Sequence, residues 1–167
     1  MAAGQTYVPI ATTTLGSAAA SYTFSSIPST YTDLVLITNY GLSADADSTL
    51  YVNGVNTGTS YSETYLRGDG LTASSGRRSN QPRWILGLAS VTVPTTLSTT
   101  EIHQFQNYSN TTTYKTVLSR INNGGVQVAA RVGLYSSTSA ISSITVGGIS
   151  ANLLAGSTFT IYGISAA

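Results

Sequence analysis

The stretch Val126-Gln127-Val128-Ala129-Ala130-Arg131-Val132-Gly133-Leu134-Tyr135 decides the fold class. Its aliphatic residues recur at every second position, so that Val126, Val128, Ala130, Val132 and Leu134 share one face of an extended chain. The opposite face carries Gln127, Ala129, Arg131, Gly133 and Tyr135. This alternation predicts a β-strand with one face exposed to water.

The rest of the chain favours the same class of fold. Helical spacing of apolar residues is missing, and helix formers such as Glu, Lys and Gln are scarce. Two runs, 34–37 and 84–93, are apolar on both faces, which is typical of central or interface strands. Seven further strands are predicted at 21–27, 49–52, 61–66, 101–108, 114–121, 141–146 and 158–164.

Turn residues separate these strands. Asn53-Gly54 is a dipeptide that accepts positive φ and predicts a two-residue hairpin, and the Asn-Asn-Gly-Gly run at 122–125 predicts a second one. Short strands with frequent turns indicate an all-β fold, an antiparallel β-sandwich of the jelly-roll kind. At 167 residues the chain is long enough for one such domain.

Composition narrows the classes of partner. The chain holds 24 serines and 26 threonines, but only 8% of its residues are charged and its net charge is +1. Binding to nucleic acid or to a membrane surface needs a concentrated basic field, so neither partner is expected. No apolar run approaches the roughly 20 residues that span a bilayer. Without cysteine there is no disulfide and no thiolate ligand.

Two segments depart from the strand pattern. Residues 1–17 are polar with three apolar anchors, Tyr7, Val8 and Ile10. We expect this segment to be an extended N-terminal arm that orders on a neighbouring subunit. One sandwich domain would follow at 18–167. Residues 67–83 are rich in Gly, Ser and Arg and are long for a loop.

The second of these segments suggests a contact surface. Its three arginines, Arg77, Arg78 and Arg83, precede Trp84 and are candidates for a protein contact, because guanidinium groups grip carboxylates bidentately. The alternative is a solvated loop.

Three short patterns have a simpler structural explanation beside the functional one. Arg67-Gly68-Asp69 matches an integrin-binding tripeptide, but a glycine-rich turn explains it equally. The two carboxylates of the segment 45–47 could bind calcium or belong to a solvated loop. His103 is the sole histidine and is accompanied by no nucleophile motif, so we expect no catalytic residues, no metal and no cofactor.

Several longer segments carry a resemblance. They are Gly16-Ser17-Ala18-Ala19-Ala20-Ser21-Tyr22-Thr23-Phe24, Tyr65-Leu66-Arg67-Gly68-Asp69-Gly70, Tyr108-Ser109-Asn110-Thr111-Thr112-Thr113-Tyr114-Lys115 and Gly156-Ser157-Thr158-Phe159-Thr160-Ile161-Tyr162. Their order and spacing over residues 12 to 164 resemble a set of tailed-bacteriophage virion surface proteins. The resemblance implies β-sandwich subunits, often trimeric, that decorate the capsid or form the ends of tail fibres.

The function expected from these observations is structural. The chain would decorate and cement the outer surface of a bacteriophage capsid as a homotrimer, with the major capsid protein lattice as its partner, and would not be an enzyme. The alternative is a receptor-binding or glycan-binding end module of a tail fibre.

Overall fold

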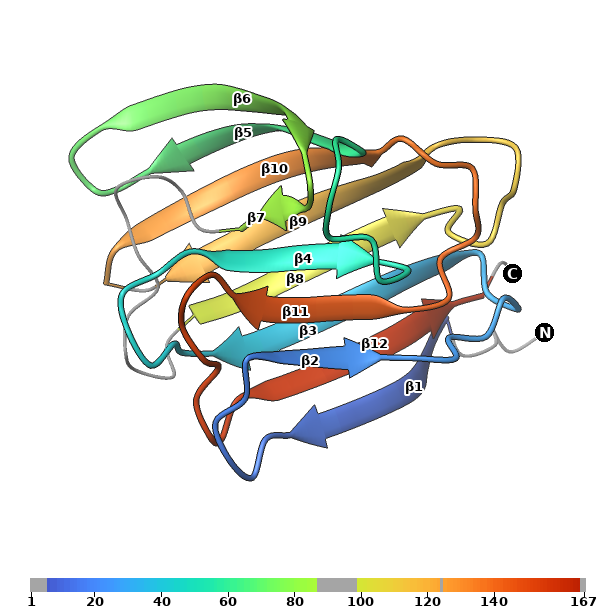
Figure 1. The fold of residues 1–167 in the computed structure, drawn as a ribbon, viewed down its shortest axis with the longest axis horizontal. Helices are drawn as coiled ribbons and strands as arrows, with labels where there is room; N and C mark the ends of the chain where they lie inside the picture. Colours follow the sequence, from blue (N-terminus) through green and yellow to red (C-terminus); the bar gives the residue numbers. More distant parts are fainter. Residues whose placement is uncertain (1–5, 87–98, 124, 166–167) are drawn as a thin grey trace.

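A computed structural model describes residues 6–86, 99–123 and 125–165. The described residues form twelve strands in two antiparallel sheets that face each other (Figure 1). No described segment is a helix, and none could cross a membrane as one. The predicted all-β sandwich is confirmed.

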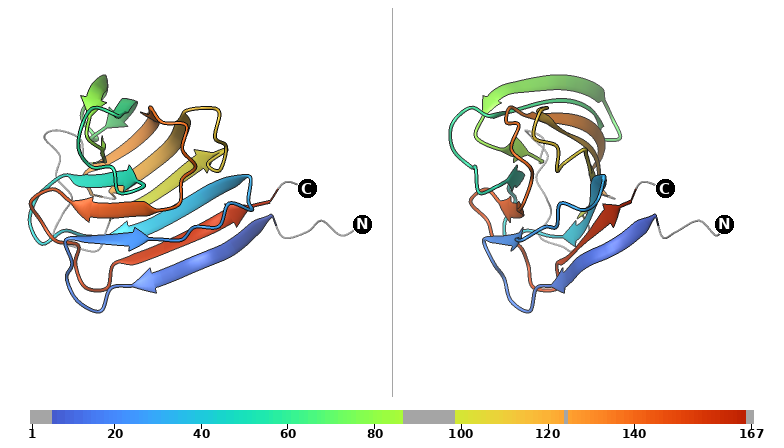
Figure 2. Two further views of the ribbon diagram at one scale, coloured as in Figure 1. Left: turned by 45° about the vertical axis from the view of Figure 1, so that its right-hand side comes forward. Right: turned by 90° about the vertical axis from the view of Figure 1, so that its right-hand side faces the viewer.

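The larger sheet has eight strands. In spatial order they are β1 (Tyr7–Thr14), β12 (Thr158–Ile164), β3 (Asp33–Tyr40), β8 (Thr99–Gln106), β9 (Lys115–Asn123), β10 (Gln127–Tyr135), β5 (Tyr61–Gly68) and β6 (Ala73–Gln81). The smaller sheet has four, in the order β2 (Ser21–Phe24), β11 (Ile144–Gly148), β4 (Ser48–Val52) and β7 (Trp84–Ile85). The smaller sheet therefore covers only one side of the larger one (Figure 2).

The core fills the space between the sheets with aromatic and aliphatic side chains. Trp84 packs edge-on against Tyr61 with ring centroids 4.8 Å apart, and Tyr61 stacks on Tyr135 at 4.9 Å. At the other end Tyr22 of the small sheet stacks on Phe159 of the large one at 5.5 Å. Aromatic pairs with this geometry add stability beyond the area that they bury, so they fix the two sheets together at both ends.

The run at 34–37 is central, as predicted. β3 lies between β12 and β8, and Leu34, Val35 and Leu36 are all buried. Of the run at 84–93, Trp84 and Ile85 form β7, whereas residues 87–93 lie outside the described part of the chain.

The two turn predictions had different outcomes. β9 and β10 pair as a hairpin at the predicted turn, in which the Val126 amide donates to the Asn123 carbonyl at 2.9 Å; residue 124 of the 122–125 run lies outside the described residues. Asn53 and Gly54 both have positive φ and form a tight turn, closed by the Val55 amide on the Val52 carbonyl at 3.0 Å. The predicted hairpin there is wrong, because β4 pairs with β11 and β7 while the next strand, β5, belongs to the other sheet.

Both edge strands of the large sheet fall in segments that the sequence analysis set apart. Residues 7–14 are extended, as predicted, but they do not order on a neighbouring subunit: they form β1, which pairs with β12 of the same chain across a bulge at 9–11 and so belongs to the sandwich. The predicted loop at 67–83 is corrected, because most of it is β6, an antiparallel partner of β5. An edge strand is held by backbone hydrogen bonds to one neighbour and needs no alternating side-chain pattern. For this reason the sequence did not predict strands in these two segments.

Candidate functional site

The outer face of the large sheet, the side that turns away from the small sheet, carries two adjacent apolar rows. The strand register places side chains of one row directly opposite one another across six strands. One row consists of Thr160, Ile37, Ile102, Arg120, Ala130 and Leu66, and the other consists of Tyr162, Val35, Gln104, Leu118, Val132 and Thr64.

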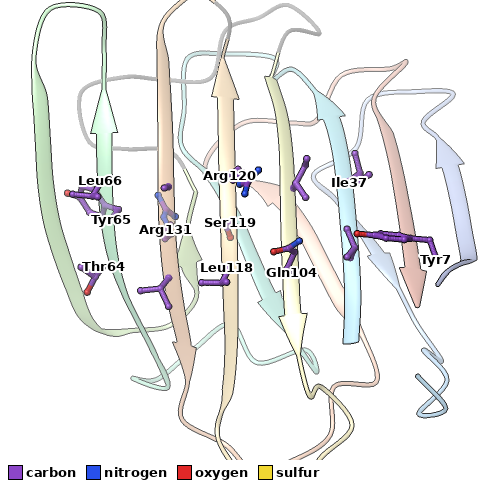
Figure 3. Close-up of a pocket in the computed structure, with 14 residues that line it drawn as sticks. Tyr7, Ile37, Thr64, Tyr65, Leu66, Gln104, Leu118, Ser119, Arg120 and Arg131 are labelled. Atoms are coloured by element: carbon purple, nitrogen blue, oxygen red, sulfur yellow. The ribbon is translucent and has the colours of Figure 1, made fainter. Parts of the chain in front are cut away.

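Three aliphatic side chains of these rows are open to solvent, whereas Val35 is buried and Ile37 and Ile102 are half-buried. Leu66 is 65% exposed, Val132 45% and Leu118 42%. They line a shallow groove of about 550 Å³, which Figure 3 shows crossing the sheet from Leu66 on β5 to Tyr7 on β1. The ring of Tyr7 reaches over the groove from the edge of the sheet and lies edge-on to Tyr162, with the centroids 6.1 Å apart (Figure 3).

A more polar row borders the groove on one side. It consists of Thr158, Asn39, Thr100, Asn122 and Val128. From strand spacings the two rows, six strands wide, cover about 390 Å² of the sheet, and with a bordering row on each side about 780 Å². The area of the two rows is that of the largest apolar patch on a typical monomer, about 300 to 600 Å², which is often functional, and an apolar centre beside polar residues is the usual anatomy of a protein interface.

Arg120 is the one charged side chain in the middle of the groove. It stands on β9 between Ile102 of β8 and Ala130 of β10, and it is exposed. Among the described residues no carboxylate forms an ion pair with it. A ligand or partner that fills the groove therefore meets aliphatic side chains, the polar side chains of Gln104 and Thr64, and the positive charge of Arg120.

The sequence predicted one face of 126–135 exposed to water without saying which, and the structure places the charged face inside. Arg131 is buried, and its guanidinium donates to Glu63 Oε2 at 3.1 Å, to the Leu86 carbonyl at 3.0 Å and to the Ile85 carbonyl. Arg78 donates to the other oxygen, Glu63 Oε1, at 2.9 Å. The face of β10 exposed to water is thus the apolar one, and the face with Gln127 and Arg131 is buried.

Burial sets the ionisation of this cluster. Desolvation raises the pKa of the Glu63 carboxyl, and the positive charges of Arg131 and Arg78 lower it in opposition. Desolvation likewise lowers the pKa of Arg131, while Glu63 raises it. The cluster joins β10 and β5 to the residues of β7 and so fastens the two sheets, but its atoms are not offered to a ligand.

A second buried cluster superficially resembles a hydrolytic site. His103 Nδ1 lies 2.8 Å from Ser119 Oγ, and His103 Nε2 lies 3.1 Å from Glu101 Oε2. The Tyr40 hydroxyl continues the chain, 2.9 Å from Glu101 Oε1 and 2.5 Å from Ser48 Oγ.

This second cluster is closed to substrate. The side chains of His103 and Glu101 are 0% and 1% exposed, and Ser119 is buried as well. Burial and the neighbouring Glu101 raise the pKa of the Tyr40 hydroxyl well above its usual value, so it keeps its proton and donates it to the carboxylate. The cluster is a hydrogen-bonded link from β4 through β3 and β8 to β9.

The candidate interface residues predicted from sequence are separated by the fold. Tyr7 lies on the groove, whereas Val8 and Ile10 point to the other side of β1, and Ile10 packs against the core.

The arginine cluster is divided too. Arg77 is exposed on β6 and Arg83 is half-buried, but Arg78 is bound to Glu63. Trp84 is fully buried and donates to the Ser62 carbonyl at 3.3 Å. Arg78 and Trp84 are therefore part of the interior.

The remaining candidates are explained locally. Asp69 Oδ1 accepts the amides of Thr72 and Leu71, at 2.7 and 3.0 Å, and Oδ2 accepts the Thr72 hydroxyl at 2.9 Å. The carboxylate therefore shapes the turn between β5 and β6. No group of three or more potential ligand residues is found in the described part of the chain, so Asp45 and Asp47 have no further acidic or histidine neighbour to share a metal.

The groove residues of β8, β9 and β5 were missed by sequence reasoning. Leu66, Leu118 and Arg120 carry no motif. One signal could have pointed to this face. Polar Gln127 and Arg131 alternate with Val128 and Val132 on β10.

Comparisons with known proteins give no assignment. No family model matches the chain, and no curated protein matches it either. Among solved structures, the galectin LEC-6 of Caenorhabditis elegans aligns with 9% identity and a TM-score of 0.34, over 93% of this chain and 96% of that one. An aerolysin-like protein of Bombina maxima aligns with 11% identity and a TM-score of 0.12, over 86% and 88%. Neither likeness supports a function.

Proposed function

We propose that this chain is a structural virion protein of a bacteriophage, which decorates and cements the outer surface of the capsid as a homotrimer. Its partner is the lattice of the major capsid protein. Binding that occurs only on the assembled lattice stabilises the lattice by mass action, so the role requires contact surface and no chemistry.

One observation carries the proposal, namely the apolar outer face of the large sheet. A monomer in solution rarely leaves several neighbouring aliphatic side chains exposed on a flat sheet, because that surface is better buried against protein. Here the side chains of Leu66, Leu118 and Val132 are exposed while Glu63 and Arg131 are placed in the interior. The resemblance to phage virion surface proteins adds the setting in which such a face is used.

The side chains that could act in catalysis and are buried do not form an accessible active site. The sole histidine is sealed between the sheets, and two of the six carboxylates of the chain, Glu63 and Glu101, are buried with it. We therefore propose a non-enzymatic role.

The test is the copy number of the polypeptide in purified virions, measured by quantitative mass spectrometry against the major capsid protein. One copy per capsid subunit, or a simple fraction of that ratio, is the expected result. The major capsid protein from the same gradient fraction of virions serves as the internal standard. Absence from virions would overturn the proposal.

A few copies per particle would point instead to the end of a tail fibre. In that case the groove, with Tyr7, Gln104 and Arg120 along it, is the surface to test with glycan arrays. Groove substitutions that abolish glycan binding would establish that alternative.

A further inference from the structure

We propose that the turn between β5 and β6 of one copy docks in the outer-face groove of the next copy, with Leu71 on the apolar rows and Asp69 beside Arg120. This inference rests on the proposed homotrimer and names its contact. The turn, residues 69–72, is called the tip below.

The tip presents an apolar side chain with nothing to cover it. Leu71 is 95% exposed, more than any other large hydrophobic side chain among the described residues. Gly70, at φ 86°, turns the chain so that the tip projects beyond the paired parts of β5 and β6. The hydrogen bonds of Asp69 with Thr72 and Leu71 hold the tip in one conformation, so little order has to be gained when it docks.

Charge decides against the simplest occupant of the groove, the same face of a second copy. Arg120 stands on β9, beside the middle of the eight-stranded sheet. Two sheets packed face to face about a central twofold axis would bring the two Arg120 side chains together. The central rows contain no carboxylate to separate them, so this arrangement would bury like charges.

The carboxylate that fits Arg120 can be found by elimination. The chain has six acidic residues, of which Glu63 and Glu101 are buried. The leucines nearest in sequence to Asp33, Asp45 and Asp47 are all buried, namely Leu34, Leu42 and Leu50. Asp69 alone lies next to a large exposed apolar side chain.

The ionisation of Asp69 suits the contact. Hydrogen bonds from the backbone of Thr72 and then of Leu71 lower the pKa of its carboxyl, which is therefore charged at neutral pH. Three of its roughly four acceptor positions are used within the tip, and one is left for a guanidinium donor.

A tip that enters a groove elsewhere on the next copy makes a heterologous contact. Such contacts close into a ring when the rotation between copies allows it, and a threefold ring is the closure that agrees with the proposed trimer. Every copy then uses one tip and one groove, and no groove remains open.

The first experiment measures the mass of the purified full chain by sedimentation velocity and light scattering at micromolar concentration. The wild-type chain should be trimeric, and Leu71→Ser and Asp69→Asn should each raise the dissociation constant at least about tenfold, because each removes one side of the contact. Tyr114→Ser is the matched control, since Tyr114 is 57% exposed and lies outside both tip and groove. Circular dichroism of each variant verifies that it is folded.

A mixing experiment separates this contact from a face-to-face contact between two grooves. Leu71→Ser has an intact groove, and Leu118→Asp has an intact tip, so at a concentration where each variant alone is monomeric their mixture should form a one-to-one pair. A trimer that survives Leu71→Ser would overturn the inference and leave the virion proposal standing. A monomeric wild-type chain would overturn it as well, whereas absence from virions counts only against the proposed function.

Discussion

Replacing Arg131 with methionine should expose how much the sandwich depends on its buried charges. Methionine fills a similar volume, but it removes the bonds to Glu63, to the Leu86 carbonyl and to the Ile85 carbonyl. The Leu86 carbonyl is left without this donor, while Arg78 still contacts Glu63 and Ile85.

The size of the effect follows from these losses. An orphaned buried carbonyl costs about 1 to 3 kcal/mol, and breaking a buried ion pair by removing one partner costs about 3 to 5 kcal/mol in total. We therefore expect Arg131→Met to lose about 3 to 5 kcal/mol of unfolding free energy, which for a chain of this size lowers Tm by roughly 10 °C.

The loss should also depend on pH. Desolvation raises the pKa of Glu63 and Arg131 lowers it, so without Arg131 the folded-state pKa rises further above the ordinary value of 4.5. A raised folded-state pKa means that the folded chain favours the neutral carboxyl. The stability contributed by the neutral Glu63 carboxyl is complete below the pKa of the unfolded chain and is lost as pH rises through the pKa of the folded chain. The penalty of the variant should therefore be largest at neutral pH and shrink as pH falls toward 4.5.

Urea unfolding followed by circular dichroism at several pH values measures both effects. Arg77→Met, the same change at an exposed position of β6, is the control and should alter stability by less than about 0.5 kcal/mol. A loss for Arg131→Met no greater than that of the control, or one that stays constant with pH, would refute the reasoning.

Three further predictions follow from the packing. Gly133→Ala should cost about 1 to 3 kcal/mol and shift the emission of Trp84, because an added Cβ would lie 2.5 Å from the Trp84 ring nitrogen; Gly125→Ala, in open space, should change neither. His103→Leu should lose about 2 kcal/mol in urea unfolding, since its buried carboxylate and hydroxyl neighbours lose their shared partner; unchanged stability would contradict that role. Millimolar calcium should leave Tm unmoved, and a rise abolished by replacing the carboxylates of 45–47 would reveal a metal site.

The local chemistry of the chain predicted much of the fold. β-branched and aromatic residues at a period of two marked most of the central strands, and the Asn-Asn-Gly-Gly run marked the β9 to β10 hairpin. The edge strands β1 and β6 escaped because their stability comes from backbone pairing with one neighbour, which leaves little trace in the side-chain pattern.

The candidate site was largely beyond sequence reasoning. Tyr7 was selected and lies on the groove, but Trp84 and Arg78 were selected as contact residues and are interior. Arg120 and Leu71 are single residues in unremarkable segments. They gain meaning only when the sheet register places Arg120 among aliphatic side chains and the β5 to β6 turn leaves Leu71 uncovered.

By itself the sequence determined that this chain is an all-β domain of low charge, because alternation and turn residues act between near neighbours. Only the tertiary structure decided which side of each strand faces inward. Val128 and Arg131 alternate equally well in either orientation, since a period of two defines two faces without ranking them. The choice was made by partners far away in sequence, because Glu63 and the carbonyls of Ile85 and Leu86 satisfy Arg131 inside the sandwich and leave the valines outside.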